Sequence, residues 1–235
     1  MPLDALFFGA HPDDVELTSG GLAALLASHG HRVGIVDLTR GEAGTRGTTE
    51  QRALEAEAAA AALGAARRDN LELPDTGIRS GDRDQLTAVV GCLREHRPAL
   101  VVAPDRHDDH PDHVEASRLV ARACHLAGLS RMAGPGVRFR PERLLFALYR
   151  RLALPHLVVD ITPVWERRMS ALRAHASQIE GEGPATYLTD PGFLSEVESR
   201  ARVFGASIGA RFGEGYRARG PIAIHDARSL LGISS

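Results

Sequence analysis

Residues 5–14 of this 235-residue chain, ALFFGAHPDD, combine an apolar run with a polar segment. The first half, Ala5–Gly9, is an apolar run that ends in glycine, which is typical of a buried strand. A helix rich in alanine and leucine is expected after it, at Gly20–Ser28. The polar segment HPDD (residues 11–14) therefore lies where the first strand ends and the first helical region begins.

The same alternation of strand and helix continues to about residue 128. Further strands are expected at Val33–Leu38, Leu71–Leu73 and Ala99–Ala103. Helices are expected from Thr48 to Leu63, from Asp82 to His96 and from His113 to Ala127, with Thr48, Asp82 and Asp112 as their capping residues. Strands separated by helices of this length favour a parallel sheet with helices on both faces. The predicted fold is a Rossmann-like three-layer α/β sandwich with a mostly parallel sheet.

After Gly128 the pattern changes. A Gly/Arg/Pro loop at Ser130–Pro141 precedes expected strands at Leu144–Tyr149 and Leu157–Ile161, helices near Trp165–His175 and Phe193–Phe204, and a Gly-rich tail at Gly205–Gly220. No repeat or low-complexity linker separates the two parts. We expect a single domain over residues 1–235, with a core at about 1–128 and a small C-terminal extension at 129–235.

Composition excludes several classes of protein. All 28 basic residues are arginine, so neither a Schiff-base lysine nor a lysine-containing P-loop is present. No Gly-x-Gly-x-x-Gly follows the first strand, which argues against an NAD enzyme. The net charge of −2 and the lack of a long apolar run favour a soluble, cytoplasmic protein that binds neither nucleic acid nor membrane. Cys92 and Cys124 are expected to be small buried side chains.

Polar side chains collect after three of the predicted strands. HPDD (residues 11–14) follows the first, TRGE (39–42) with Arg46 and Arg52 follows the second, and DRHDDHPDH (105–113) follows Ala99–Ala103. Ligands of open α/β sheets bind beyond the carboxyl ends of strands, where the winding reverses. Since the first and fourth strands flank that point, the two His/Asp segments are expected to face each other.

Imidazole and carboxylate together suit zinc, and a site with three protein ligands leaves a position for water. His11 and Asp14, three residues apart around a turn, can converge on one ion, and one distant histidine completes the set. Spacing alone does not say whether that histidine is His107, His110 or His113. Asp13 is then available as a general base. The arginines of the Gly/Thr-rich second loop suit a clamp for substrate.

Less specific interpretations exist for each segment. Asp13 or Asp14 can cap the next helix, but His11 would then have no role. The three histidines of residues 107–113 can belong to a solvated loop. The occurrence of both segments at strand ends favours a metal site over either alternative.

AHPDD (residues 10–14) together with HPDH (110–113) resembles the zinc-dependent PIG-L/LmbE-like N-deacetylases. Within that family the chain looks most like the bacillithiol-biosynthesis deacetylases of the first type. The similarity runs over nearly the whole chain, and the supporting segments are DLTRGE (37–42), GTRGT (44–48), PGFL (191–194) and GEGYR (213–217).

The resemblance implies an amidohydrolase that removes the acetyl group from an N-acetylglucosamine moiety. For this subgroup the substrate would be N-acetylglucosaminyl malate, an intermediate of bacillithiol biosynthesis. The residues that match the family's metal ligands are His11, Asp14 and His113, which would hold one Zn²⁺ per chain. Fe²⁺ can occupy similar ligand sets.

The resemblance also assigns catalytic and binding roles. Asp13 matches the general base and His110 the residue that stabilises the oxyanion, with Asp112 placed to orient it. Arg52 matches a substrate-binding arginine, and with the Arg46 loop it would bind the malate carboxylates. Asp109 stands where similar proteins often carry an arginine before the position of His110, which puts substrate preference in question.

Two other functions remain open. One is a zinc deacetylase for a different N-acetylglucosamine conjugate, which substrates with and without malate would separate. The other is a non-catalytic protein that binds metal or sugar on the same fold, and Asp13, which metal binding does not require, argues against it. Similar proteins are commonly oligomeric, so the resemblance implies a homo-oligomer, often a hexamer, with a small-molecule substrate as its partner.

Overall fold

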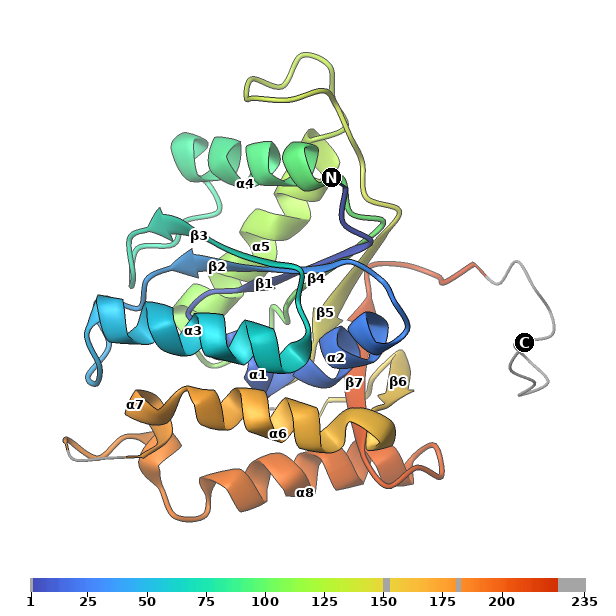
Figure 1. The fold of residues 1–235 in the computed structure, drawn as a ribbon. Coiled ribbons are helices and arrows are strands. Elements are labelled where there is room, and N and C mark those ends of the chain that lie inside the picture. The colour runs from blue at the N-terminus through green and yellow to red at the C-terminus, as the bar shows by residue number, and fades with distance from the viewer. Residues whose placement is uncertain (1, 150–152, 181–182, 224–235) are drawn as a thin grey trace.

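The computed structural model describes residues 2–149, 153–180 and 183–223 and contains one seven-stranded sheet between layers of helices (Figure 1). The strands are β1 (Ala5–Gly9), β2 (Val33–Thr39), β3 (Arg67–Leu73), β4 (Leu100–Pro104), β5 (Arg143–Ala147), β6 (Leu157–Asp160) and β7 (Gly213–Ala218). Their order is β3-β2-β1-β4-β5-β7-β6. The first five in that order are parallel, and β7 is antiparallel to both neighbours. The predicted α/β sandwich with a mostly parallel sheet is confirmed.

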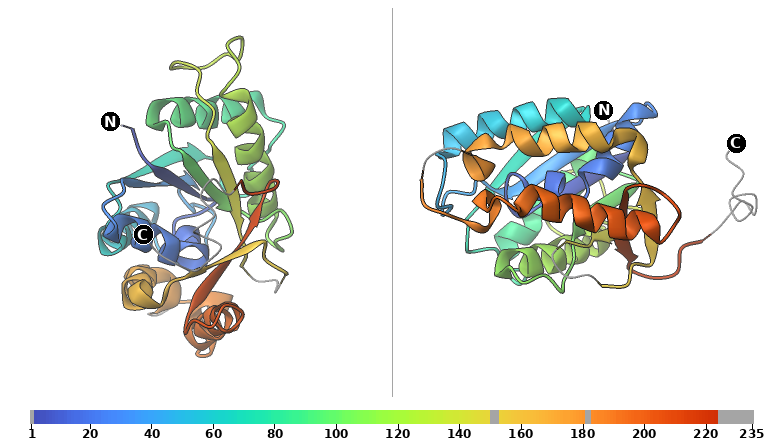
Figure 2. Two further views of the ribbon diagram at one scale, coloured as in Figure 1. Left: turned by 90° about the vertical axis from the view of Figure 1, so that its right-hand side faces the viewer. Right: turned by 90° about the horizontal axis from the view of Figure 1, so that it is seen from below.

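The helices cover both faces of the sheet. They are α1 (Asp14–Thr18), α2 (Gly20–Ser28), α3 (Thr49–Leu63), α4 (Arg83–His96), α5 (Pro111–Leu126), α6 (Trp165–Ala174), α7 (Ala176–Ile179) and α8 (Phe193–Ala206), with short 3₁₀ turns at Thr162–Val164 and Tyr187–Thr189. Helices α4 and α5 lie on one face, whereas α1, α2, α3 and α6 lie on the other (Figures 1 and 2). Helix α8 packs against β7.

Strand β1 shows why the central strands of this sheet are continuous apolar runs in the sequence. Ala5 and Phe7 belong to the core under α2, α3 and α6, whereas Leu6 and Phe8 belong to the core under α4 and α5. Because successive side chains of a strand point to opposite faces, a sheet covered on both sides needs apolar residues at every position. The order of the strands reverses between β1 and β4, so the expected switch point lies there.

The structure corrects the expectation of a Gly-rich tail after residue 205. Residues 213–218 form strand β7, which inserts between β5 and β6. Glu214 of this strand is 4% exposed, and its carboxylate accepts hydrogen bonds of 2.8 Å from the main-chain N–H groups of Gly21 and Leu22 at the start of α2. The strand is fixed by distant partners of this kind, and local composition does not reveal them.

The capping assignment for α5 is also wrong. The helix begins at Pro111, and His110 is its capping residue, because His110 Nδ1 accepts the main-chain N–H of Asp112 at 3.2 Å. Thr48 and Asp82 do cap α3 and α4 as expected. Cys92 and Cys124 are buried free thiols, as expected. Among the described residues, no helix is both long and apolar enough to cross a membrane.

Candidate active site

The two His/Asp segments meet at the carboxyl ends of β1 and β4. These strands are neighbours in the sheet, and the turn after β1 faces the loop that joins β4 to α5. The rings of His11, His110 and His113 have centroids 4.8 to 5.6 Å apart. Their convergence is the juxtaposition that the sequence predicts for the switch point.

His11, Asp14 and His113 form a group whose nitrogen and oxygen atoms can share one metal ion. Asp14 Oδ2 lies 3.5 Å from His11 Nδ1, and Asp14 Oδ1 lies 3.1 Å from His113 Nε2. Ligands that each bind zinc at about 2.0–2.2 Å in a tetrahedron are separated by distances of this size. The donor set and its spacing therefore fit zinc.

The other nitrogen of each histidine is held by a carboxylate. His11 Nε2 lies 3.1 Å from Asp75 Oδ1, and His113 Nδ1 lies 3.2 Å from Asp108 Oδ2. A carboxylate behind an imidazole ligand fixes its ring orientation and tautomer and makes it a stronger donor. Neither aspartate was predicted from the sequence to have a role, although Asp75 follows β3 and Asp108 lies within the His/Asp segment 105–113.

Removing one of these supporting carboxylates is expected to weaken metal binding. We expect Asp108→Asn and Asp75→Asn each to lower zinc affinity by roughly 10–100-fold, because the imidazole loses its partner but not its ligand nitrogen. Competition with a fluorescent chelator measures this. Asp84→Asn, an exposed aspartate on α4, is the control and should leave the affinity unchanged. Wild-type affinity in both test variants would show that Asp75 and Asp108 do not support the metal ligands.

The cluster carries an excess of carboxylates, which favours a bound cation. Burial lowers the pKa of His113, but the charge of Asp14 and the bond to Asp108 outweigh it and raise the pKa to about 10. The bond to His11 lowers the pKa of Asp75 to about 2. Without a metal ion, protonated imidazoles balance the negative charge of these carboxylates. A bound metal ion would supply that positive charge instead.

Asp13 stands beside this group without belonging to it. Its backbone has φ 120° and ψ −25°, outside the region that non-glycine residues normally adopt, and its side chain is buried. Burial raises the pKa of the Asp13 carboxyl to about 6, against the opposing charge of Arg52. Strained residues with perturbed pKa values cluster at functional sites, which makes Asp13 the best candidate for proton transfer.

His110 and Asp112 lie at the start of α5 in an arrangement that the sequence did not predict. The main-chain N–H of Asp112 is the group that contacts His110, whereas the Asp112 carboxylate accepts the N–H of Thr76 at 2.8 Å and lies 3.4 Å from His11 Nε2. Because His110 Nδ1 is an acceptor, the neutral ring carries its proton on Nε2. Burial and the charge of His113 lower the pKa of His110, which favours this neutral form.

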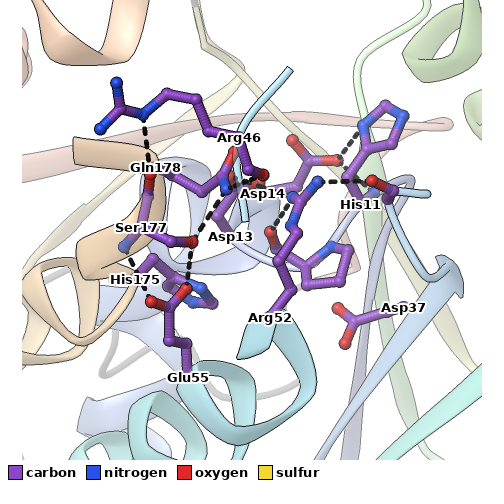
Figure 3. Close-up of polar contacts among 12 residues, drawn as sticks. His11, Asp13, Asp14, Asp37, Arg46, Arg52, Glu55, His175, Ser177 and Gln178 are labelled. Carbon is purple, nitrogen blue, oxygen red and sulfur yellow. Dashed lines mark hydrogen bonds and ion pairs between the residues drawn. The ribbon is translucent and has the colours of Figure 1, made fainter. Parts of the chain in front are cut away.

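Arg52 is buried behind Asp13, on the first turns of α3. Its Nη2 donates to the carbonyl of Pro12 at 2.8 Å and lies 3.5 Å from Asp13 Oδ2, while its Nη1 donates to the carbonyl of Gly41 at 3.0 Å (Figure 3). A Cβ at Gly41 would clash with Nη1, so only glycine leaves room for the guanidinium. Arg52 thus ties the HPDD turn to the loop after β2.

Arg46 joins the β2–α3 loop to the segment after α6. Its Nε donates to the carbonyl of Ser177 at 2.9 Å (Figure 3). Its two Nη atoms donate to the carbonyls of Glu180 and Pro184, at 2.6 and 3.1 Å. In return, Gln178 Nε2 donates to the carbonyl of Arg46. The predicted role of Arg46 and Arg52 in binding substrate carboxylates stays a prediction, and these contacts also give both guanidinium groups a structural role.

Comparisons with known proteins agree with this geometry. The model of the PIG-L family, described as GlcNAc-PI de-N-acetylase, matches residues 6–124, which hold the candidate metal group, Asp13, His110 and both arginines. A 1D-myo-inositol 2-acetamido-2-deoxy-alpha-D-glucopyranoside deacetylase of Rhodococcus opacus is 29% identical, with 74% of this chain and 81% of the relative covered. A diacetylchitobiose deacetylase of Thermococcus kodakarensis is 28% identical, with 92% and 82% covered.

A solved structure extends the similarity to the rest of the chain. The crystal structure of a conserved protein from Thermus thermophilus superimposes with a TM-score of 0.87 at 36% identity and covers 94% of this chain and 97% of its own. The family model and this structure together account for both the site and the C-terminal strands. The chain belongs to the PIG-L family of de-N-acetylases and is, as a member of it, an enzyme of the amidohydrolase class.

Proposed function

We propose that the protein hydrolyses the N-acetyl group of an N-acetylglucosamine conjugate with the help of Zn²⁺, and that it releases acetate and a free amine. One observation carries this proposal. Asp13, a buried carboxylate that is not in the three-ligand group, lies next to Asp14 in that group and is held by Arg52. A protein that only binds metal or sugar needs no such residue.

His11, Asp14 and His113 would hold the ion. When bound, zinc polarises a carbonyl oxygen and lowers the pKa of water towards ~7. The second possible group, His11, His110 and Asp112, shares His11 with the first. We assign the ion to the first group, because there Asp75 and Asp108 occupy the remaining imidazole nitrogens.

Asp13 would move the proton in both halves of the reaction. It accepts a proton from the attacking water as the new C–O bond forms at the amide carbonyl carbon. It then returns that proton to the amide nitrogen, which is a poor leaving group until it is protonated. A carboxyl whose pKa is raised to about 6 can act as base and then as acid near neutral pH.

His110 would stabilise the charge that develops on the amide oxygen. With Nδ1 accepting the N–H of Asp112, the Nε2–H of the neutral ring is the donor. A preoriented hydrogen-bond donor at a developing oxyanion is typically worth about 10²–10³ in rate. The N-cap contact fixes the ring, so Asp112 would orient His110 through its main chain.

We propose N-acetylglucosaminyl malate as the substrate, with a role in bacillithiol biosynthesis. The relatives described above support the N-acetylglucosamine part, because their names give deacetylases of a glucosaminyl inositol and of diacetylchitobiose. The malate part rests on the sequence resemblance. We further propose one catalytic domain over residues 1–235, with its core at about 1–128, in a cytoplasmic homo-oligomer; a hexamer is the form that the resemblance implies.

The substrate assay tests the chemistry and the conjugate together. Zinc-loaded protein is incubated with N-acetylglucosaminyl malate and with free N-acetylglucosamine, and released primary amine is measured with and without a chelator. Chelator-sensitive release that strongly favours the malate conjugate supports both parts. Equal release from both substrates keeps the deacetylase and removes the malate assignment. No release from either, with metal bound, contradicts the proposal.

Metal content separates the proposed ligands from the proposed base. His113→Ala is expected to lose both zinc and activity, because one of three protein ligands is gone. Asp13→Ala is expected to keep zinc and lose activity. Mass spectrometry measures the zinc content of both variants after dialysis. Loss of zinc from Asp13→Ala would place Asp13 among the ligands.

Replacing Arg52 with lysine is expected to change kcat more than KM. Arg52→Lys cannot make the contacts to Pro12, Gly41 and Asp13 with one ammonium group, so Asp13 is less well placed. We expect kcat to fall by roughly tenfold or more with KM within about twofold of wild type. A rise in KM with unchanged kcat would instead show that Arg52 binds the substrate. Exposed Arg40, in the loop between β2 and α3, supplies the control Arg40→Lys.

A further inference from the structure

A large cavity lies beside the β4–α5 loop, whose residues Asp105, Arg106 and His107 belong to its lining. It has a volume of about 1110 Å³ and is bounded by α5, by strands β5 and β7 and by the segment of residues 154–156. Figure 2 shows α5 beside these two strands. None of the described residues assigned above to metal binding or proton transfer lines this cavity.

Its lining is strongly cationic. Among the described residues that line it, five are arginines, namely Arg106, Arg118, Arg122, Arg217 and Arg219, and one is a carboxylate, Asp105. A chain with a net charge of −2 has no general surplus of positive charge that would explain this. Cationic side chains around a concave, low-dielectric surface focus a positive potential and attract anions.

Most of this charge is not neutralised within the described part of the chain. Arg217 Nη1 lies 3.4 Å from Asp105, and Arg118 pairs with Glu115 on the same helix. Within residues 2–149, 153–180 and 183–223, the other three have no carboxylate within 4.0 Å, and the partners of Arg122 and Arg219 are main-chain carbonyls. Guanidinium groups without carboxylate partners are available for the bidentate binding of a carboxylate or phosphate.

Part of the remaining lining is apolar, and the rest is Ser117 and three histidines. Leu126 of α5 and Phe146 of β5 lie half-buried in the wall, and Leu154 stands at the rim with 87% of its surface exposed. Sites for small molecules combine an apolar wall with a few placed polar groups, and a volume of this order accommodates a molecule of metabolite size. The lining therefore suits an organic molecule with both an apolar or sugar-like body and acidic groups.

The cavity shares two elements with the active site. Helix α5 carries His113 near its start and Arg118 and Arg122 further along, and the loop from Asp105 leads directly to Asp108, the partner of His113. His107 Nδ1 lies 2.9 Å from Asp105 and 2.7 Å from Arg217 Nη1. An anion that binds Arg217 would compete with Asp105 and change the contacts of that loop.

We propose that this arginine-lined cavity is a second binding site, specific for small organic anions that carry at least two negative charges. Two sources share this chemistry. The anion is either the acidic end of the deacetylase substrate, an assignment that rests on the proposed function, or a separate molecule that acts on the enzyme through α5. Either source gives the cavity a ligand that the metal centre does not require.

Direct binding tests the site without reference to turnover. Phenyl phosphate, which joins a dianion to an apolar ring, is titrated by calorimetry, with phenol as the matched neutral probe and malate as the matched acid without a ring. The test variant is Arg122→Gln with Arg219→Gln, and the charge-matched control is Arg83→Gln with Arg173→Gln, which removes two exposed arginines elsewhere. We expect binding of phenyl phosphate and none of phenol.

The test variant is expected to bind phenyl phosphate at least roughly tenfold more weakly, because it loses two guanidinium groups that can form charge-assisted hydrogen bonds with the dianion. The control should bind like wild type. No binding to wild type, or an equal loss in both variants, overturns the proposal. Light scattering measures the oligomeric state, which gives one further outcome that would contradict the proposal. If the test variant changes its oligomeric state and wild type binds no probe, the cavity is an interface between copies.

Kinetics then identify the source of the anion. If the cavity takes the substrate's acidic end, phenyl phosphate competes with N-acetylglucosaminyl malate, and the test variant raises KM for that conjugate but not for free N-acetylglucosamine. If the anion is a separate ligand, phenyl phosphate changes kcat for both substrates without competition. A protein that binds phenyl phosphate through Arg122 and Arg219 yet hydrolyses neither substrate retains the site and refutes only the proposed function.

Discussion

Replacing Asp13 with asparagine is expected to lower kcat by at least ~10² while bound zinc stays at its wild-type level. The amide has the size of the carboxyl group and can still place an oxygen near Arg52, which lies 3.5 Å from Asp13 Oδ2, but it cannot take a proton from water at neutral pH. Steady-state release of primary amine and metal analysis of the same sample measure the two quantities. Wild-type turnover in this variant would remove Asp13 from the mechanism.

Replacing Asp13 with glycine is expected to stabilise the protein. At φ 120° an L-residue is strained by about 1–3 kcal/mol, and glycine is not. The larger backbone entropy of glycine in the unfolded chain opposes this gain by about 0.5–1 kcal/mol. We expect Asp13→Gly to raise the free energy of unfolding in urea by roughly 1 kcal/mol, with activity lost. Lower stability in Asp13→Gly than in Asp13→Asn would show that the backbone at residue 13 is not strained.

Most of the fold could be predicted from local patterns. The apolar runs of β1, β2 and β4 lie close to their expected positions because a strand buried on both faces must be apolar throughout. The convergence of the two His/Asp segments followed from the same reasoning, since neighbouring parallel strands end at one edge of the sheet. Because β1 and β4 are neighbours, the segments that follow them come together and form the candidate metal group.

The remaining features depend on contacts between distant residues. Strand β7 is held partly by Glu214, whose carboxylate binds the start of α2, nearly two hundred positions earlier in the chain. Asp75 lies beside His11 only because β3 ends next to β2 at the same edge. No spacing rule within a short segment reveals such partners. Spacing also could not show that Arg46 and Arg52 would be occupied by main-chain carbonyls.

A buried ion-pair network beneath the site centres on Arg68, and removing that residue is expected to lower the stability of the protein. Arg68 of β3 has only 6% of its side chain exposed, and its guanidinium lies 2.6 Å from Glu16 and 2.8 Å from Asp37. Glu16 belongs to α1, the short helix that begins at Asp14, and its second oxygen lies 3.3 Å from the fully buried His175. Arg68 is thus the cation that joins β2 and β3 to the helix of a proposed metal ligand.

Arg68→Met is expected to lower the free energy of unfolding at pH 7 by about 3–5 kcal/mol. Removing one partner of a buried ion pair leaves the other charges without compensation, and here two carboxylates lose their cation. Burial raises the pKa of Glu16, but the charge of Arg68 outweighs it and brings the pKa to about 2, so Glu16 is ionised in both the folded and unfolded states at pH 7. The loss is therefore fully present at that pH, and chemical denaturation measures it.

The adjacent residue provides the control for this prediction. Arg67 pairs with Asp69 and Glu95 on the surface, with 51% of its side chain exposed, so Arg67→Met should change stability by no more than about 0.5 kcal/mol. Combining Arg68→Met with Glu16→Gln and Asp37→Asn should recover much of the loss, because the uncompensated charges are then gone. Equal effects of Arg67→Met and Arg68→Met would show that burial does not set the strength of this network. Recovery of stability without recovery of zinc binding would show that α1 needs Arg68 to hold Asp14 in place.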